Sequence, residues 1–270
     1  MTQALQQEKA TLIDIGANLS HESFRDDFDQ VIERAKTAGI EKLILTGTDT
    51  SSNQRAIELC QLYPDYLFST VGLHPHEADN YTNELLADLR EQAMHDCVKS
   101  LGETGLDFNR NYSSPKHQEH AFTEQLGLAA ELNMPIFLHQ RDAHERFLPI
   151  LKDYREHLSK VVVHCFTGNK AELFDYLDMD LYIGITGWIC DERRGYSLHP
   201  LLKEIPANRL MLETDAPYLM PRNIEPKPTT RRNEPANLPF VLAMVSKCLE
   251  KKPETVAKQT SSNARDFFAL

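Results

Sequence analysis

The feature that most constrains the fold of this chain is a regular alternation of short apolar runs with amphipathic stretches. Eight times, a run of about five aliphatic or β-branched residues precedes a segment with helical periodicity. The expected strands span residues 12–16, 42–46, 67–71, 98–103, 135–139, 160–164, 181–185 and 210–215. The expected helices span residues 28–38, 52–63, 84–95, 115–132, 143–157, 171–177, 197–204, 238–249 and 254–268.

The expected strands are continuous apolar runs, which is typical of strands buried on both faces. Eight strand-then-helix units in 270 residues predict an α/β fold of the TIM-barrel type, because such barrels are commonly about 250 residues long. No segment has the composition of a linker, so we expect a single domain over residues 1–270. No G-x-G-x-x-G or P-loop pattern follows any expected strand, which argues against a nucleotide cofactor.

Composition narrows the setting in which the protein works. The sequence contains no apolar run of about twenty residues and no signal-peptide pattern, so we expect no membrane association. Five cysteines without a CxxC pair indicate free thiols and a cytoplasmic location. No obligate protein partner is evident. The net charge of −11 excludes wholesale electrostatic capture of nucleic acid but allows a local basic rim around a site.

Glu103 is the first candidate for a functional side chain, because it lies between Gly102 and Gly105 at the end of an expected strand. A bare carboxylate there is costly unless a basic side chain or a divalent metal sits against it. Four further ligand-type residues stand at the ends of other expected strands: His74, His139, His164 and Asp215. Because these strand ends converge on one mouth of a barrel, the five residues favour a metal site. Histidine with carboxylate suits Mg²⁺, Mn²⁺ or Zn²⁺ without selecting sharply among them.

Six segments of the chain resemble the signature segments of the TatD family of metal-dependent deoxyribonucleases. They are GLHPH at 72–76, GETGLD at 102–107, VHCFTG at 163–168, CDERRG at 190–195, LETDAPY at 212–218 and RRNEP at 231–235. The resemblance implies a cytoplasmic, Mg²⁺-dependent exonuclease that digests single-stranded DNA from the 3′ end, with RNA as a further substrate and a part in DNA repair. It also implies metal ligation by Glu103, His139, His164 and Asp215, with His74 contacting metal or phosphate.

The first expected strand departs from the family pattern. The wider family opens with Asp-x-His-x-His, and both histidines bind metal, whereas this chain has Gly16 and Asn18 at those places. Glycine offers no side chain and asparagine offers a carbonyl oxygen, so we expect one metal position to be weakly held. This fits Mg²⁺, which keeps waters and uses substrate phosphates as ligands, better than a tightly caged Zn²⁺.

Within this site we expect Glu103 and Asp215 to be the catalytic residues. Glu103 would orient the metal, and Asp215 would take the proton of the attacking water. Glu213 lies two residues before Asp215 and is either a supporting acid of the site or an internal barrel residue paired with a basic neighbour. Cys165, which follows a ligand on its strand, is expected to point away from the mouth into the layer between barrel and helices.

Basic and aromatic side chains in the loops after the strands are the candidates for substrate binding. The expected residues are Arg110, Arg193, Arg194, Arg231, Arg232 and Trp188. The arginines would hold phosphates and Trp188 would stack on a base, a role also open to Tyr112 and Tyr218. The alternative is that several of these arginines pair with neighbouring acids such as Asp191 and Glu234.

Two other functions remain open at this point. A barrel amidohydrolase or lactonase would act on C–N or C–O bonds, and related amidohydrolases often bridge two metals with a lysine where this chain has Glu103. A metal-binding barrel that has lost catalysis is the second alternative, against which the presence of both Glu103 and Asp215 weighs.

Overall fold

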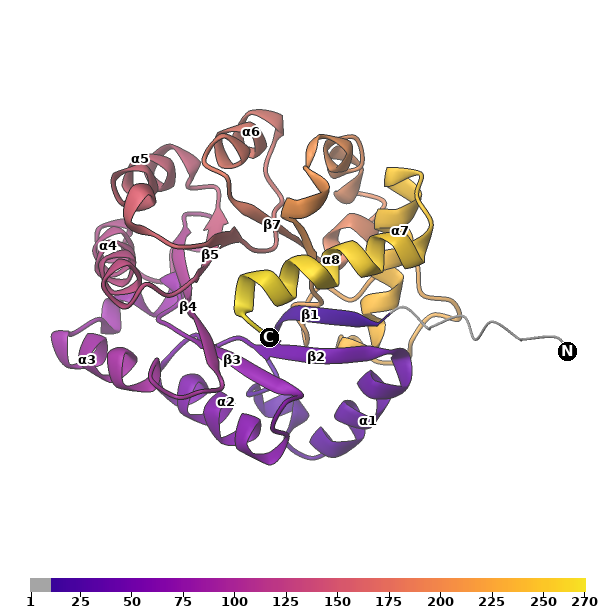
Figure 1. Ribbon diagram of the computed structural model, residues 1–270, viewed down its shortest axis with the longest axis horizontal. Coiled ribbons are helices and arrows are strands. Elements are labelled where there is room, and N and C mark those ends of the chain that lie inside the picture. Colours follow the sequence, from indigo (N-terminus) through magenta and orange to yellow (C-terminus); the bar gives the residue numbers. More distant parts are fainter. Residues whose placement is uncertain (1–10) are drawn as a thin grey trace, which may run out of the picture.

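The computed structural model describes residues 11–270, in which eight parallel strands form one sheet in the order of the sequence (Figure 1). The strands are β1 Leu12–Ala17, β2 Ile40–Leu45, β3 Leu67–Val71, β4 Val98–Asp107, β5 Ile136–Arg141, β6 Val161–Val163, β7 Tyr182–Ile185 and β8 Leu210–Leu212. A parallel bridge between Ala17 and Ala216 joins the end of the sheet to its beginning. The ring of strands is therefore nearly closed, and the predicted TIM barrel is confirmed.

Helices lie around the outside of this ring, except for the C-terminal helix, which runs across the ring (Figure 1). They are α1 Phe28–Ala38, α2 Thr50–Leu62, α3 Asn83–Gln92, α4 Pro115–Leu132, α5 His144–Tyr154, α6 Lys170–Asp178, α7 Leu238–Leu249 and α8 Pro253–Phe268. In α4 the local sequence sets both limits. The Ser114 side chain accepts a hydrogen bond from the His117 N–H, Pro115 takes the first helical position, and Asn133 ends the helix in a left-handed conformation.

The connection after β7 differs from the helix predicted at residues 197–204. The structure has short 3₁₀ segments there, Gly187–Cys190, Gly195–Leu198, Leu201–Glu204 and Ala207–Arg209. Pro200 falls inside the predicted span and has no backbone N–H to donate, so a continuous ladder of helical hydrogen bonds cannot run through it. The helical pattern is thus real but is broken into single turns.

The apolar core forms two layers, one inside the barrel and one between the strands and the helices. Ile13, Ile44 and Phe137 fill the interior together with Phe267 and Phe268 from α8. The side chain of Asn263 in α8 donates to the Leu210 carbonyl at the start of β8, so α8 closes the end of the barrel where the strands begin. Burial on both faces explains why the strands are uniformly apolar. The opposite end stays open to ligands.

Within residues 11–270, no helix combines the length and the apolar character that a bilayer span requires.

Candidate active site at the barrel mouth

Two glycines place Glu103 at the mouth of the barrel. Gly102 and Gly105 have φ angles of 114° and 142°, which residues other than glycine rarely adopt. A Cβ atom at Gly102 would lie 2.2 Å from the Phe137 carbonyl oxygen, and one at Gly105 would lie 1.9 Å from the His139 carbonyl oxygen. The sequence GETG thus lets β4 press against β5 while it turns the nearly buried Glu103 side chain towards the open end.

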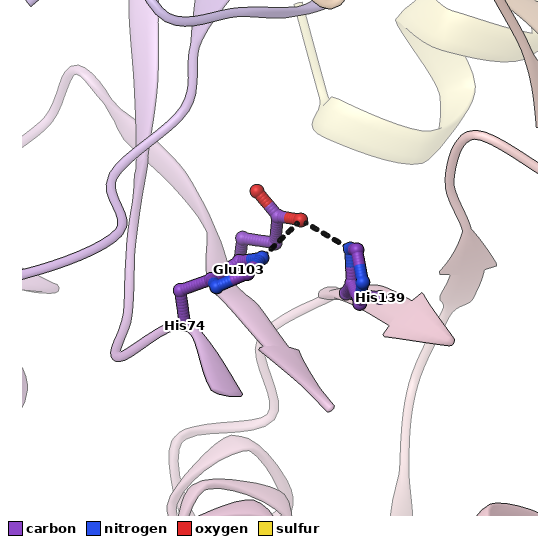
Figure 2. A group of neighbouring side chains, drawn as sticks. All are labelled: His74, Glu103 and His139. Atoms are coloured by element: carbon purple, nitrogen blue, oxygen red, sulfur yellow. Dashed lines mark hydrogen bonds and ion pairs between the residues drawn. The ribbon is translucent and has the colours of Figure 1, made fainter. Parts of the chain in front are cut away.

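Three imidazoles converge on one oxygen of Glu103. Its Oε1 atom lies 2.7 Å from Nε2 of His164, 2.8 Å from Nδ1 of His139 and 3.2 Å from Nε2 of His74. Figure 2 shows His74 and His139 approaching this oxygen from their separate chain segments. The structure therefore brings together four of the five ligand-type residues that the sequence indicated.

Asp215, the fifth of these residues, follows β8 and faces the same cavity. Its backbone N–H donates to the Gly16 carbonyl at 2.8 Å, and its carboxylate accepts a hydrogen bond of 2.9 Å from Nδ2 of Asn18. Burial raises the pKa of Asp215 to about 7. Asn18 therefore supports a carboxylate of the site with its amide nitrogen.

Glu213 occupies the space next to Gly16 on the first strand. A Cβ atom on Gly16 would lie 2.5 Å from Oε2 of Glu213. The Glu213 carboxylate is fully buried, accepts a hydrogen bond from the Cys165 N–H and lies 3.3 Å from Nδ1 of His164. Glu213 thus combines the two roles open from the sequence, because it is buried inside the barrel and supports the site by pairing with His164. It holds the His164 ring with Nε2 towards Glu103.

Cys165 lies at the mouth, so the prediction that it points into the layer between barrel and helices is wrong. The expected alternation fails because β6 ends at Val163 and Cys165 adopts a left-handed conformation with φ of 45°. Its side chain lines the cavity beside His164. Burial raises the pKa of the Cys165 thiol to about 12, so it stays a thiol at neutral pH.

The charges of the central pair compensate each other. Burial opposes ionisation of Glu103, but the imidazoles of His164 and His74 outweigh it and hold the carboxyl pKa well below its ordinary value. Burial likewise opposes protonation of His164, but the carboxylates of Glu103 and Glu213 raise its pKa well above the ordinary value. The site is therefore built around a buried carboxylate, Glu103, and a buried imidazolium, His164, that stabilise each other.

His74 has the proton arrangement of a hydrogen-bond donor. Its Nδ1 atom accepts a hydrogen bond of 3.1 Å from the His76 N–H. Burial lowers the pKa of His74 to about 4, so at neutral pH the ring carries one proton, which then sits on Nε2. Nε2 faces Glu103. Nε2 is therefore the His74 atom available for either contact that the resemblance allows, a metal or a phosphate.

Asp107, which the sequence analysis did not select, braces two of the histidines. Its Oδ2 atom lies 2.8 Å from Nε2 of His76 and 3.4 Å from Nε2 of His139. The longer contact lacks hydrogen-bond geometry, since Nε2 of His139 has no hydrogen-bond partner among residues 11–270, so it acts through charge. Burial opposes ionisation of Asp107, but His139 and His76 lower its pKa. The sequence signal was its place as the last residue of GETGLD.

The donor set fits a divalent metal. Ligand atoms of His74, Glu103 and His139 lie within 4.8 Å of one another. His164 reaches the same Glu103 oxygen, and Asp215 adds a second carboxylate in the cavity. Imidazole nitrogens and carboxylate oxygens together are the ligands that Mg²⁺, Mn²⁺ and Zn²⁺ bind in mixed sites.

A cavity of about 1160 Å³ lies at the mouth, and only some of the predicted substrate-binding residues line it. Arg110, Arg194 and Trp188 line it, and so do Arg25 and Arg141, which the sequence analysis did not select. The Arg194 guanidinium lies 4.0 Å from the centre of the Trp188 ring.

The other three predicted arginines lie outside the lining of this cavity. Arg193 pairs with Asp191 at 3.0 Å. Arg232 pairs with Asp27 at 2.7 Å and with Glu234 at 2.8 Å. Arg231 is exposed. Arg193 and Arg232 thus pair with the neighbouring acids that the sequence offered as the alternative to phosphate. Arg194 lines the cavity but also lies 2.9 Å from Asp191.

Comparison with known protein families shows which family this chain belongs to. The sequence profile described as TatD related DNase matches residues 13–269. The chain belongs to the TatD-related DNase family. Two relatives carry the name 3′-5′ ssDNA/RNA exonuclease TatD. The protein from Pectobacterium atrosepticum is 49% identical over 96% of this chain and all of the relative. The protein from Erwinia billingiae is 50% identical over 96% of this chain and 99% of the relative.

Solved structures of TatD-family proteins share the architecture. A TatD family hydrolase from Entamoeba histolytica superposes with a TM-score of 0.87 at 26% identity, covering 96% of this chain and 98% of its own. A TatD homologue from Escherichia coli also has a TM-score of 0.87, at 25% identity, covering 97% of this chain and 99% of its own. Family and fold therefore agree over nearly the whole chain.

Proposed function

We propose that this TatD-family chain is a metal-dependent exonuclease that hydrolyses phosphodiester bonds of single-stranded DNA from the 3′ end, with RNA as a second substrate. The observation that carries the proposal is the convergence of three imidazoles on one Glu103 oxygen at the barrel mouth. Relatives with 49% identity that are named as such exonucleases support the choice of substrate.

Mg²⁺ is the metal we propose, because Gly16 and Asn18 stand where the family pattern has two imidazoles, so that carboxylates, which Mg²⁺ prefers, make up half of the remaining ligands. Glu103, His139, His164 and Asp215 would hold it. When bound, a divalent metal supplies a Lewis acid that polarises the phosphoryl oxygen and makes water a better nucleophile.

The side chains of the site then have distinct tasks. Asp215, steadied by Asn18, takes the proton of the attacking water. His74 donates its Nε2–H to a non-bridging phosphate oxygen. Glu213 and Asp107 keep the rings of His164 and His139 in place. We assign these tasks from the hydrogen-bond contacts of each side chain, because an atom that already has a protein partner positions the group and a remaining atom can meet the substrate.

Arginines of the rim hold the phosphates further along the strand. We assign this task to Arg110, Arg141 and Arg194, which line the cavity. Arg193, Arg231 and Arg232 stand outside its lining, so the proposal gives them no phosphate. Guanidinium groups at the rim attract the substrate backbone although the whole molecule is acidic.

We further propose that the chain acts as one catalytic domain in the cytoplasm and serves the repair of DNA ends. The five free cysteines fit a reducing compartment.

One assay separates this function from the two alternatives. The protein is incubated with 5′-labelled single-stranded DNA, with a dipeptide and lactone panel, and with Mg²⁺ or EDTA. We expect shortening of the DNA from its 3′ end with Mg²⁺, none with EDTA, and none with folded Glu103→Ala. Cleavage of dipeptides or lactones with DNA left intact would identify an amidohydrolase or lactonase. Metal binding without hydrolysis of any substrate would identify a barrel that has lost catalysis.

A further inference from the structure

Two exposed tyrosines stand at the mouth of the barrel. Tyr112 and Tyr218 have exposed fractions of 66% and 52%, and both line the cavity that holds the ligand-type residues. Leaving large aromatic rings in water beside a buried polar cluster is a feature of surfaces that bind a partner or a ligand.

The two tyrosines lie on opposite sides of this cavity. Tyr112 is in the loop after β4, and Tyr218 is in the loop after β8. In a ring of eight strands taken in sequence order, β4 and β8 are four positions apart, which is the largest separation the ring allows. A ligand centred in the mouth therefore meets one ring on each side.

Tyr112 reaches the proposed catalytic groups through the ring of His76, and Tyr218 lies three residues after Asp215. The Tyr112 ring lies 4.8 Å from the His76 ring, whose own centre is 4.2 Å from that of His74. On the other side, the Tyr218 N–H donates to the Asp215 carbonyl at 2.9 Å. The rings thus flank the position where a phosphate would meet His74 and Asp215.

Trp188, which the sequence suggested for base stacking, is less suited to that task. The Arg194 guanidinium lies 4.0 Å from the centre of its ring, and the Arg141 guanidinium lies 6.0 Å from it. The Arg194 guanidinium covers one face of the ring, so a nucleobase can reach only the opposite face. Trp188 instead supports the arginines of the rim.

We propose that Tyr112 and Tyr218 each stack on one of the two nucleobases that flank the scissile phosphate, the terminal base and its neighbour. The inference rests on the proposed exonuclease function and names the part of the substrate that the mouth recognises. Aromatic stacking tolerates every base, since each has a π-face. It also requires the two bases to separate from each other and from a complementary strand, so the tyrosines select frayed or single-stranded ends.

The test combines variants with oligonucleotides that lack one base. Tyr112→Leu and Tyr218→Leu are compared with the wild type on intact DNA and on DNA with an abasic site at the terminal or the penultimate position. On intact DNA we expect each variant to raise KM about tenfold or more, because one stacking contact is lost. The increase in KM of each variant should disappear on the substrate that lacks the base on which the replaced tyrosine stacks. It should therefore disappear on the terminal abasic substrate for one variant and on the penultimate abasic substrate for the other.

Matched variants separate stacking from other effects. Tyr112→Phe and Tyr218→Phe keep the rings and should leave KM within about twofold of the wild type. Tyr196→Leu changes a tyrosine that is 63% exposed but does not line the cavity, and it should have no effect. Trp188 is the one tryptophan of the chain and lines the cavity, so its fluorescence gives the dissociation constant of each oligonucleotide independently of turnover.

Two results would overturn the inference. One is an unchanged KM and dissociation constant in both leucine variants. The other is a defect of equal size on intact and abasic DNA, which would show that the tyrosines do not contact the bases. Failure of the wild type to shorten DNA would contradict the proposed function instead, and the fluorescence titrations would still test the tyrosines.

Discussion

At the scale of single residues, Gly16 explains how the first strand can differ from the family pattern and still serve the same mouth. The position is filled from the neighbouring strand β8, because the carboxylate of Glu213, the residue after β8, lies where a side chain on residue 16 would have to be. That carboxylate in turn holds His164. The space of the histidine in the family pattern is thus taken by an acid that pairs with His164, a proposed metal ligand.

This packing predicts that Gly16→Ala destabilises the protein although alanine is small. Its Cβ would lie 2.5 Å from Oε2 of Glu213, so a buried, hydrogen-bonded carboxylate has to move. We expect a loss of about 1–3 kcal/mol in the free energy of unfolding, measured by urea denaturation. Gly127→Ala is the control, because its Cβ would only touch Tyr154 at 3.8 Å inside α4. Equal stability of both variants would show that Glu213 yields without cost.

The contacts of Asp107 with His76 and His139 lead to a second prediction, which concerns metal affinity. In Asp107→Asn the Oδ1 atom can still accept from the N–H groups of Asn109 and Arg110, while an amide replaces the Oδ2 that faces His76 and His139. Losing a carboxylate that orients a ligand should weaken metal binding about 10- to 100-fold. Chelator competition measures this affinity. The exposed pair Asp79–His117 supplies the control Asp79→Asn, which should bind metal like the wild type.

At the scale of elements, the loop between β8 and α7 is tied to the segment before α1. Arg232 donates to both carboxylate oxygens of Asp27 at 2.7 Å and to Glu234 at 2.8 Å. Arg34 joins the same acids, at 3.0 Å from Asp27 and 2.7 Å from Glu234. These four side chains hold one wall of the mouth in place.

This network predicts a stability difference that depends on pH. Hydrogen bonding by Arg232 lowers the pKa of Asp27 from 3.8 to about 2. A pKa that is lower in the folded state adds stability that is complete above about pH 4 and is lost as the pH falls towards 2. Arg232→Gln should therefore cost about 1 kcal/mol at pH 7, and its difference from the wild type should narrow between pH 5 and pH 3.

Urea denaturation at several pH values measures this difference. Arg90→Gln removes the exposed pair with Glu131 and is the control, with little change expected at any pH. A difference for Arg232→Gln that stays constant down to pH 3 would show that Asp27 is not its partner in solution.

The elements also show what the sequence could and could not reveal. The strand ends that carry His139, His164 and Asp215 were found because strand order alone brings them to one mouth. Cys165 was misplaced because alternation holds only while the strand continues. The partners of Glu213 and Arg232 come from elements far away in the chain, so no local pattern indicates them.

At the scale of the whole molecule, the protein must attract a polyanion although its own net charge is −11. Long-range attraction is therefore absent, and affinity has to come from arginines that contact phosphates within the mouth. Arg110 and Arg141 line the cavity. Arg231 is exposed and does not line it. These positions allow the origin of the affinity to be tested with paired variants.

We expect Arg110→Ala and Arg141→Ala to raise KM for single-stranded DNA while turnover at saturation stays close to that of the wild type, because the rim binds and does not take part in the chemistry. Each lost phosphate contact should also reduce the slope of log K against log salt by about 0.7. Arg231→Ala is the matched control and should leave both KM and the slope unchanged. Titrations of one oligonucleotide at several salt concentrations measure the slope. Each counterion released on binding corresponds to a phosphate that the protein neutralises. A reduced slope for Arg231→Ala, with unchanged slopes for Arg110→Ala and Arg141→Ala, would therefore show that the DNA binds along the outer surface and not in the cavity.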